Sequence, residues 1–163
     1  MMAKLRIGSA YDVHQLTQGD GIILAGVKIA CAYHTIAHSD GDVVYHALGE
    51  AILGSLALGD LGTYFPPEDD SFLNMDSALI IKFCQNKLDE AKYEICNIDI
   101  SIIAESPKLQ PHILSMRNSI KDILQLELNQ VSVKAGTNEG LDAIGQKKAI
   151  GCFATVLIQK IEK

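Results

Sequence analysis

The sequence predicts one α/β (or α+β) domain, in which helices pack against a single mixed β-sheet. Its 163 residues are close to the ~150 residues of a typical domain. No repeat, proline-rich linker or block of charge divides the chain, so residues 1–163 are treated as one unit. Strand-like and helix-like patterns alternate along the chain, which is typical of helices and strands built around one sheet.

In the first half, the patterns predict two strands and then a helix. Residues 5–13 form the first expected strand, and residues 21–29 form the second, after a Gly-Asp-Gly turn. Residues 31–37 are expected to be a loop. The helix is expected from 39 to 58, where a Gly-Asp-Leu-Gly segment ends it. The loop that follows, up to Asn74, is long enough to be a candidate functional loop.

The second half continues the alternation. A second helix is expected to open at Asp76-Ser77 and to run to Leu88, and residues 95–104 alternate as a half-buried strand does. Pro111 suits the first turn of a third helix, which reaches about Leu126. Residues 130–135 form a short strand. Residues 149–161 are almost continuously apolar, which predicts a strand buried on both faces.

The helix residues from Val43 to Leu58 indicate an oligomer. They include one charged residue, and a helix that is apolar on nearly every side is buried on nearly every side. A domain of this size has difficulty enclosing both this helix and a two-sided strand. We therefore expect subunit contacts to cover part of the apolar surface.

Composition excludes several classes of protein. The apolar fraction of 48% and the charged fraction of 21% are those of a folded globular chain. A net charge of −6 has the wrong sign for a general nucleic-acid binder. No apolar run is long enough for a bilayer, and residues 1–6 lead into a strand without a signal-peptide core. We expect a cytosolic protein whose four cysteines, without any Cys-x-x-Cys pair, are reduced.

Asp12 and His14 are the first candidate metal ligands. Residues two apart on a strand point the same way, so this carboxylate and imidazole share one face. Both are zinc ligands, but an Asp-x-His pair on its own is more often a surface hydrogen bond than a metal site.

The segment from His38 to His46 is the second candidate. Ser39 and Asp42 have the spacing of a capping box, and the free N–H groups of such a helix start suit a phosphate. Asp42 either stabilises the helix N-terminus or orients His46 from one helical turn away. His46 is either a hydrogen-bonded core histidine or, with Asp12 and His14, part of a three-ligand zinc site whose open fourth position implies catalysis.

Two further segments follow strands. Residues 104–108 place Lys108 in a turn at a strand end, and residues 134–140 place a hydroxyl and a carboxylate in a glycine-flanked loop. Such a loop suits phosphate and Mg²⁺, although either segment is also explained as an ordinary solvated connection. His34, His112 and the acidic segment 68–70 are interpreted as surface residues.

Taken in order, these segments resemble the 2-C-methyl-D-erythritol 2,4-cyclodiphosphate synthase family of the non-mevalonate isoprenoid pathway. The most specific part is the His-Ser-Asp-Gly-Asp segment at 38–42 with His46. The resemblance covers essentially the whole chain and includes the segments 6–14, 58–62, 65–66, 104–108, 111–112 and 134–139.

The resemblance implies a lyase that cyclises 4-diphosphocytidyl-2-C-methyl-D-erythritol 2-phosphate and releases CMP. It implies that Asp12, His14 and His46 hold zinc. It also implies that Glu139 binds a second divalent ion, Mg²⁺ or Mn²⁺. The groups that orient and stabilise the reacting phosphorus would be His38 and Thr137.

The resemblance further implies the residues that contact substrate. Asp60 and Gly62 would meet the methylerythritol portion, a loop from Phe65 to Asp69 would close over it, and Ala104 to Gln110 would form the cytidine pocket. The implied substrate-binding residues are Asp12, Val13, His14, His38, Ser39, Asp60, Leu61, Gly62, Phe65, Pro66, Asp69, Ala104, Glu105, Ser106, Pro107, Lys108, Leu109, Gln110, Gly136, Thr137, Asn138 and Glu139.

The family is a homotrimer with sites between subunits, which agrees with the oligomer expected from the helix. Three positions depart from its pattern: Gly136 replaces a usual Thr, Ala143 a usual Phe and Gln146 a usual Arg. Two alternative functions remain open. One is a zinc-dependent phosphohydrolase, which would leave residues 104–108 without a purpose, and the other is a non-catalytic, oligomeric nucleotide-binding module.

Overall fold

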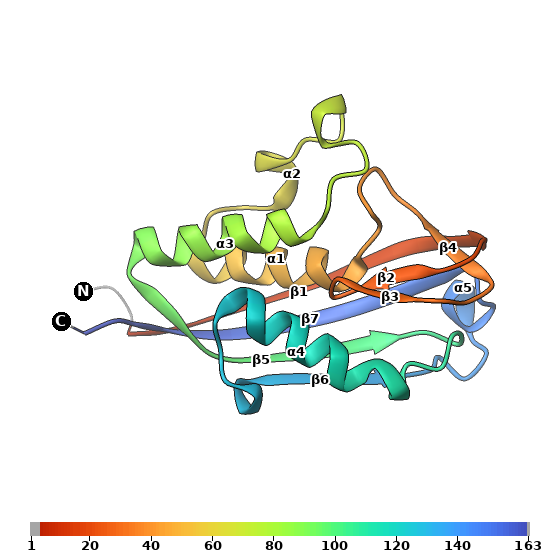
Figure 1. Ribbon diagram of the computed structural model, residues 1–163. Coiled ribbons are helices and arrows are strands. Elements are labelled where there is room, and N and C mark those ends of the chain that lie inside the picture. Colours follow the sequence, from red (N-terminus) through yellow and green to blue (C-terminus); the bar gives the residue numbers. More distant parts are fainter. Residues whose placement is uncertain (1–3, 163) are drawn as a thin grey trace.

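A five-stranded mixed sheet, covered on one face by helices, forms the framework of the molecule (Figure 1). The structure is a computed structural model and describes residues 4–162. The expectation that the chain starts without a signal peptide falls partly on residues 1–3, which lie outside the described residues. None of the helices within residues 4–162 combines the length and apolarity needed to cross a membrane.

The sheet has the strand order β4-β1-β7-β5-β6, with β5 and β6 parallel and the other neighbours antiparallel. Its strands are β1 (Leu5–Gln18), β4 (Tyr33–Ile36), β5 (Tyr93–Ile103), β6 (Val131–Gly136) and β7 (Ala149–Lys160). A separate hairpin consists of β2 (Ile22–Leu24) and β3 (Val27–Ile29). The helices are α1 (Val43–Leu56), α2 (Leu61–Tyr64), α3 (Ala78–Ala91), α4 (Ile113–Leu124) and α5 (Asp142–Gly145), with short 3-10 turns at Asp70–Phe72, Gln110–His112 and Leu128–Gln130.

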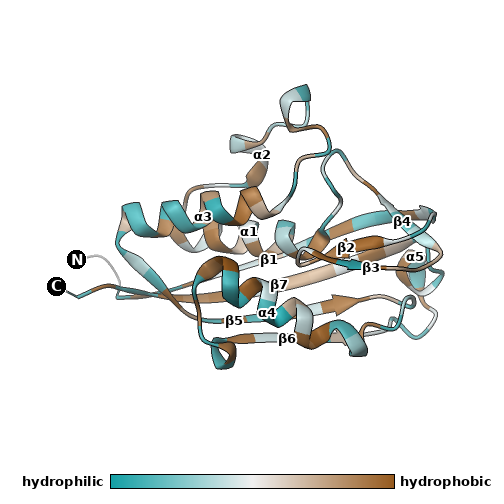
Figure 2. Cartoon of the chain, in the orientation of Figure 1, coloured by the Kyte–Doolittle hydropathy of each residue, from teal (hydrophilic) through white to brown (hydrophobic). Residues whose placement is uncertain are grey.

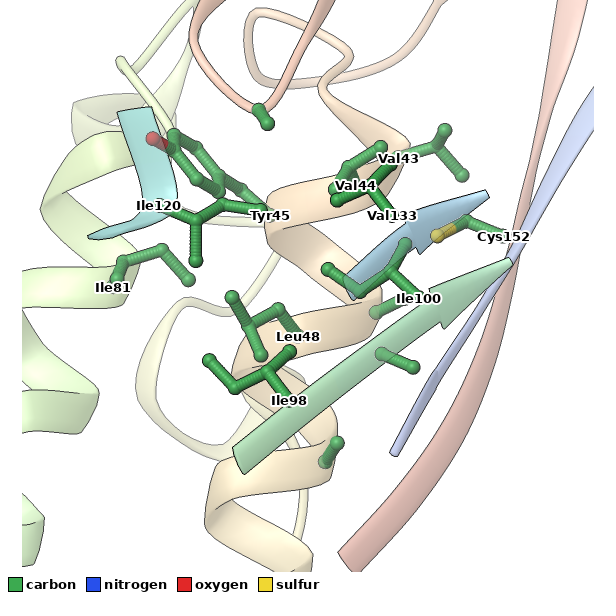
Figure 3. Close-up of a cluster of buried hydrophobic side chains, with 14 of the residues drawn as sticks. Val43, Val44, Tyr45, Leu48, Ile81, Ile98, Ile100, Ile120, Val133 and Cys152 are labelled. Atoms are coloured by element: carbon green, nitrogen blue, oxygen red, sulfur yellow. The ribbon is translucent and has the colours of Figure 1, made fainter. Parts of the chain in front are cut away.

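The core lies between the sheet and the helices α1, α3 and α4. Figure 3 shows Leu48 of α1 beside Ile98 and Ile100 of β5, all of which are fully buried. Burial alternates along the strands, so β1 turns Gly8 toward α1 and Ile7 away from it. A Cβ at Gly8 would collide with the backbone oxygen of Ala51, so this glycine permits the close approach of α1 to β1.

The opposite face of the sheet is apolar along β1 and β7, and within residues 4–162 the one helix on it is the single turn α5, whose Ile144 lies beside Gly151 and Tyr11 at one end of the face. Ile7 is 68% exposed, Tyr11 47% and Phe153 52%. The rings of Tyr11 and Phe153 lie 4.5 Å apart, centre to centre. Large apolar side chains gathered on one uncovered sheet face are typical of a surface that another protein chain covers.

Several predicted elements need correction. Residues 21–29 are not one strand: positive φ angles at Ala25 and Gly26 fold them into the β2–β3 hairpin. Residues 31–37 are not all loop, because β4 pairs with the far end of β1, which continues to Gln18. The strand β7 is buried on both faces only over its first four residues and alternates from Phe153 onward.

The first helix also begins later than expected, at Val43, because Asp42 and not Ser39 is its N-cap. The Asp42 side chain accepts hydrogen bonds from the backbone N–H groups of Val44 and Tyr45. It also accepts from Ala25 and Gly26, at 2.9 and 2.6 Å, and so joins the helix start to the hairpin turn. Burial raises the pKa of this carboxyl to about 6, although the N–H groups around it lower the pKa.

Candidate metal centre and the cleft beside it

Asp12 and His14 on β1 meet His46 on α1 at the helix-covered face of the sheet. His14 Nε2 lies 3.0 Å from Asp12 Oδ2, and His46 Nδ1 lies 3.3 Å from the same oxygen. The two ring nitrogens are 3.1 Å apart. The two-residue strand spacing and the histidine in the apolar helix were the sequence signals, and the fold brings these three side chains together.

The outward nitrogen of each imidazole is held by the surrounding chain. His14 Nδ1 lies 3.0 Å from the Gly41 carbonyl oxygen, which only accepts hydrogen bonds, so this nitrogen carries the proton. His46 Nε2 lies 3.0 Å from both Ser39 Oγ and Ser77 Oγ. With its proton on Nδ1, His14 presents the lone pair of Nε2 toward Asp12, and Nδ1 of His46 faces the same carboxylate oxygen.

This arrangement fits a divalent cation. Asp12 Oδ2 is buried and receives no hydrogen bond within residues 4–162, although two imidazole nitrogens face it. Burial raises the pKa of Asp12, but its contacts with His14 and His46 lower it by more, so the pKa is well below its usual range. Two imidazoles and one carboxylate with one open side form a ligand set that suits catalytic zinc.

A cleft of about 520 Å³ opens beside the three ligands. Of the predicted site residues, Asp12, His14, His38, Ser39, His46, Leu61 and Phe65 line it. His38 Nε2 is buried without a hydrogen-bond partner among the described residues, so it is available to a ligand in the cleft. Val13 lies on β1 between two ligands but turns its side chain to the open face of the sheet.

Glu50 is a site residue that the sequence analysis missed. It lines the cleft one helical turn after His46, and its Oε1 accepts a hydrogen bond from the N–H of Leu61 at 3.1 Å. Burial raises the pKa of this carboxyl. Its signal was present, because Glu50 is the one charged residue in the expected helix segment from Val43 to Leu58.

Four residues predicted to contact the methylerythritol portion lie in the segment 60–69 without lining the cleft: Asp60, Gly62, Pro66 and Asp69. The Asp60 carboxylate caps α2 by accepting from the Thr63 N–H and hydroxyl, and Asp69 caps the next short turn. Phe65 packs against Phe72, with ring centres 5.4 Å apart.

Two roles expected near the helix start are corrected by these contacts. Ser39 does not cap α1, and its hydroxyl instead accepts from the Gly41 N–H and faces His46. Asp42 does not orient the His46 ring, because its carboxylate is taken up by backbone N–H groups. The polar contacts of the outward nitrogen of His46 are with Ser39 and Ser77.

The segments predicted to bind the cytidine and the second metal lie toward the β6 edge of the sheet, away from β1 and the cleft. The cross-strand register places Val13, Gly151, Ile103 and Gly136 in one row across β1, β7, β5 and β6. Three strand spacings of about 4.8 Å put Val13 and Gly136 about 14 Å apart. None of residues 104–110 or 136–139 lines the cleft.

These two distal loops are joined to each other. Glu105 Oε1 accepts from the N–H groups of Asn138 and Gly140, at 2.9 and 3.2 Å. Thr137 and Glu139 are exposed, and Glu139 belongs to no group of three potential metal ligands within residues 4–162. Lys108 and Gln110 are exposed, whereas the Leu109 side chain is buried in the core and leaves only its backbone for contact. Ala104, Ser106 and Pro107 complete this segment at the end of β5.

Comparison with protein families gives a match to the YgbB family over residues 5–159. A curated relative from Xanthomonas axonopodis pv. citri is 46% identical over 161 residues, which cover 99% of this chain and 97% of the relative. Another, from Pseudoalteromonas atlantica, is 46% identical over 156 residues and is covered to 96%, as is this chain. Both relatives are named 2-C-methyl-D-erythritol 2,4-cyclodiphosphate synthase.

Solved structures agree with these relatives. The IspF structure of Plasmodium falciparum in complex with CDP is 35% identical, with a TM-score of 0.88, covering 99% of this chain and 100% of that one. The bifunctional IspDF of Campylobacter jejuni is 37% identical, with a TM-score of 0.93 over 97% of this chain. This chain spans 43% of that bifunctional protein.

Proposed function

The chain belongs to the YgbB family, and from this premise we propose that it converts 4-diphosphocytidyl-2-C-methyl-D-erythritol 2-phosphate to 2-C-methyl-D-erythritol 2,4-cyclodiphosphate and CMP. It is a cyclodiphosphate-forming lyase of isoprenoid precursor biosynthesis. An oxygen of the substrate's 2-phosphate forms a bond to the β-phosphorus, and the bond from that phosphorus to the oxygen of the departing CMP breaks. The nucleophile belongs to the substrate, so the protein has to position the groups and stabilise charge.

The observation that carries this proposal is the convergence of Asp12, His14 and His46 at the cleft. The buried, unpartnered Asp12 Oδ2 and the two inward ring nitrogens are a set of acceptors without a donor, which supports a bound cation. We assign the cation as zinc on the ligand chemistry. When bound, zinc supplies Lewis acidity toward a phosphate oxygen of the substrate.

The remaining residues would orient and neutralise the diphosphate. His38, with its unpartnered Nε2 at the cleft, and Thr137 would contact the reacting phosphorus region. Glu139 would hold a second divalent ion, Mg²⁺ or Mn²⁺, at the diphosphate. Ser39, Leu61 and the loop from Phe65 to Asp69 would enclose the methylerythritol portion.

Residues 104–110 would bind the cytidine. Two solved relatives are bound to CDP, which supports a cytidine nucleotide as ligand here. The resemblance implied that Glu105 contacts substrate. Its Oε1 instead accepts from backbone N–H groups of residues 138–140, so Glu105 would hold that loop in place. The nucleotide would then be recognised by backbone groups of this segment, with Lys108 near a phosphate.

We propose a homotrimer with sites between subunits. Within one chain, the cleft lies beside β1, whereas the distal loops (residues 104–110 and 136–140) lie at the β6 edge of the sheet. The two adjacent phosphates of one substrate must nevertheless contact both regions. A second copy that brings its β6 edge to the cleft of the first would complete the site. The apolar open face at Ile7, Tyr11 and Phe153 supports such contacts. We place the protein in the cytosol, in keeping with its free cysteines.

A product assay tests the reaction. The purified protein is incubated with the phosphorylated cytidyl substrate, zinc and Mg²⁺, and the products are followed by phosphorus NMR. Equimolar CMP and cyclic diphosphate are expected. Inorganic phosphate as the main product would indicate a zinc-dependent phosphohydrolase instead, and nucleotide binding without turnover would indicate a non-catalytic module.

A mixing experiment tests the shared site. His14→Ala and Glu139→Ala are each expected to be inactive, and random 1:1 mixed trimers should recover about one quarter of the wild-type activity, because one site in four pairs two intact halves. Recovery should require subunit exchange, which differently tagged chains report. Exchange without recovery would place both halves in one chain.

A further inference from the structure

Ser77 occupies a helix-capping position without using its hydroxyl as a cap. It precedes α3 and is fully buried, yet its side chain makes no capping hydrogen bond to that helix. A serine at this position normally accepts from an N–H group of the first turn. Here Asp76 Oδ1 takes the Ala78 N–H instead, at 2.9 Å, so the Ser77 hydroxyl is left for another purpose.

That hydroxyl lies between Asp40 and His46. Ser77 Oγ donates to Asp40 Oδ1 at 2.5 Å, and the Ser77 N–H donates to Asp40 Oδ2 at 3.0 Å. The proton of the hydroxyl is therefore directed to the carboxylate, and a lone pair of Oγ faces His46 Nε2 at 3.0 Å. In this geometry the serine oxygen is an acceptor for the imidazole.

The direction of these hydrogen bonds determines which nitrogen of His46 carries its proton. Because Ser77 Oγ accepts, the proton lies on Nε2, and Nδ1 presents its lone pair to Asp12 and His14. Carboxylate groups behind metal-binding histidines commonly orient the ring and raise its basicity. Here the carboxylate would act through an intervening serine.

We propose that Asp40 and Ser77 are positioning residues that hold His46 as the Nε2–H tautomer and so determine the affinity of the centre for zinc. The inference rests on the proposed function only in requiring a metal at Asp12, His14 and His46. It also links the metal centre to the loop that borders the cleft, because the Asp40 N–H donates to Met75 in that loop at 3.1 Å.

Two substitutions have different expected effects. In Ser77→Ala, Ser39 Oγ remains 3.0 Å from His46 Nε2 and can accept its proton, so the fall in zinc affinity should be limited to about tenfold. In Asp40→Asn, the amide would donate to Ser77 Oγ and release its proton to point at His46, which favours the wrong tautomer. The loss of zinc affinity should then approach about 100-fold. Because Asp40→Asn already breaks the hydrogen-bond chain from His46 through Ser77 to Asp40, adding Ser77→Ala should lower zinc affinity little further.

The first measurement is zinc affinity by competition with a chromophoric chelator. Ser55→Ala is the matched control, since Ser55 is also buried but donates to a backbone carbonyl within α1, and its zinc affinity should equal that of the wild type. Unchanged affinity in both Asp40→Asn and Ser77→Ala would overturn the inference. A wild-type protein without zinc affinity would instead count against the proposed function.

The second measurement is the tautomer of His46 in the metal-free protein, from ¹⁵N-detected correlations of histidine-labelled samples. The wild type should show a proton on Nε2, and Asp40→Asn should shift the population toward Nδ1–H. A purely structural role of Asp40 would lower thermal stability without moving this signal. An Nδ1–H tautomer in the wild type would contradict the proposal directly.

Discussion

The metal centre lies on β1 and α1, whereas the distal loops (residues 104–110 and 136–140) follow the ends of β5 and β6, and the two regions differ in how completely one chain builds them. At the metal centre, the outward ring nitrogen of each imidazole is held by groups of the same chain, and the inward nitrogens face the Asp12 carboxylate. In the distal loops, Thr137 and Glu139 are exposed and are hydrogen-bonded to each other: Thr137 Oγ1 donates to Glu139 Oε1 at 3.4 Å and accepts from the Glu139 N–H at 3.3 Å. One chain therefore prepares the metal-binding half of the site (the prepared half) and leaves the distal loops (the open half) exposed, where the proposed trimer would place a partner chain.

The position of each region in the sheet explains this difference. Asp12 and His14 lie under α1, which carries His46 and packs closely on β1 because Gly8 has no side chain, so the core fixes the geometry of the three ligands. The distal loops follow β5 and the edge strand β6 at the end of the sheet, where the neighbouring helix is the single turn α5. Figure 2 shows a related contrast, with largely apolar colour along α1 and β7 and mixed colour at the loops beyond β6. Preorganisation inside one chain thus decreases toward the edge of the sheet.

Loss of a ligand at the prepared half should have the largest effect. His14→Ala removes one of three convergent donors, so zinc should be lost and kcat/KM should fall by about 1,000-fold or more, while the fold persists. Metal content by mass spectrometry and turnover check this. His34→Ala, an exposed histidine on β4, is the control and should keep both. Full zinc occupancy in His14→Ala would remove His14 from the site.

The buried aspartate below the metal centre should affect stability rather than chemistry. Asp42→Ala leaves four backbone N–H groups without their acceptor, which should lower the free energy of unfolding by about 3 kcal/mol. The melting temperature should fall by roughly 10 °C at fixed protein concentration. Asp142→Ala is the matched control, because its exposed carboxylate also accepts N–H groups, at the start of α5. Equal changes in both variants would contradict the contrast between a rigid and an open region.

Much of the prepared half, with its ligands Asp12, His14 and His46, was predictable from the sequence, because short-range periodicity places these residues. The alternation of β1 puts Asp12 and His14 on one face, and His46 is conspicuous as an imidazole in an apolar helix. The six main elements after residue 38 were also expected near their observed positions, since each has a clear period of two or of 3.6 residues.

The features that could not be predicted depend on contacts between distant parts of the chain. The β2–β3 hairpin turns at Ala25-Gly26, which is not a strong turn dipeptide, and its N–H groups are satisfied by Asp42 from another element. Ser77 lies 31 positions from His46, so no local pattern relates the two. The cross-strand row that separates Val13 from Gly136 exists only once the strand order is known.

Substitution in the open half should have a smaller effect than loss of His14. Glu139→Gln keeps the size of the side chain but removes the charge that would hold the second divalent ion, so the Mg²⁺ concentration for half-maximal activity should rise and kcat/KM should fall about 100-fold. Zinc content should stay unchanged, because Glu139 is remote from the cleft within the chain. Asp122→Asn, an exposed acid on α4, serves as control. Unaltered Mg²⁺ activation would exclude Glu139 from the site.

The smallest effect is expected from restoring a side chain where this sequence departs from the family pattern. Gly136 ends β6, and a Cβ built there meets no atom within 4 Å, so Gly136→Thr should fold without strain. A β-branched residue also suits a strand, and the free energy of unfolding should rise by about 0.5 kcal/mol. If the open half contacts phosphate, the new hydroxyl should lower KM by a few-fold and leave kcat and zinc content unchanged. A raised KM would mean that a neighbouring chain packs against Gly136, since open space in one chain would then be filled in the assembly.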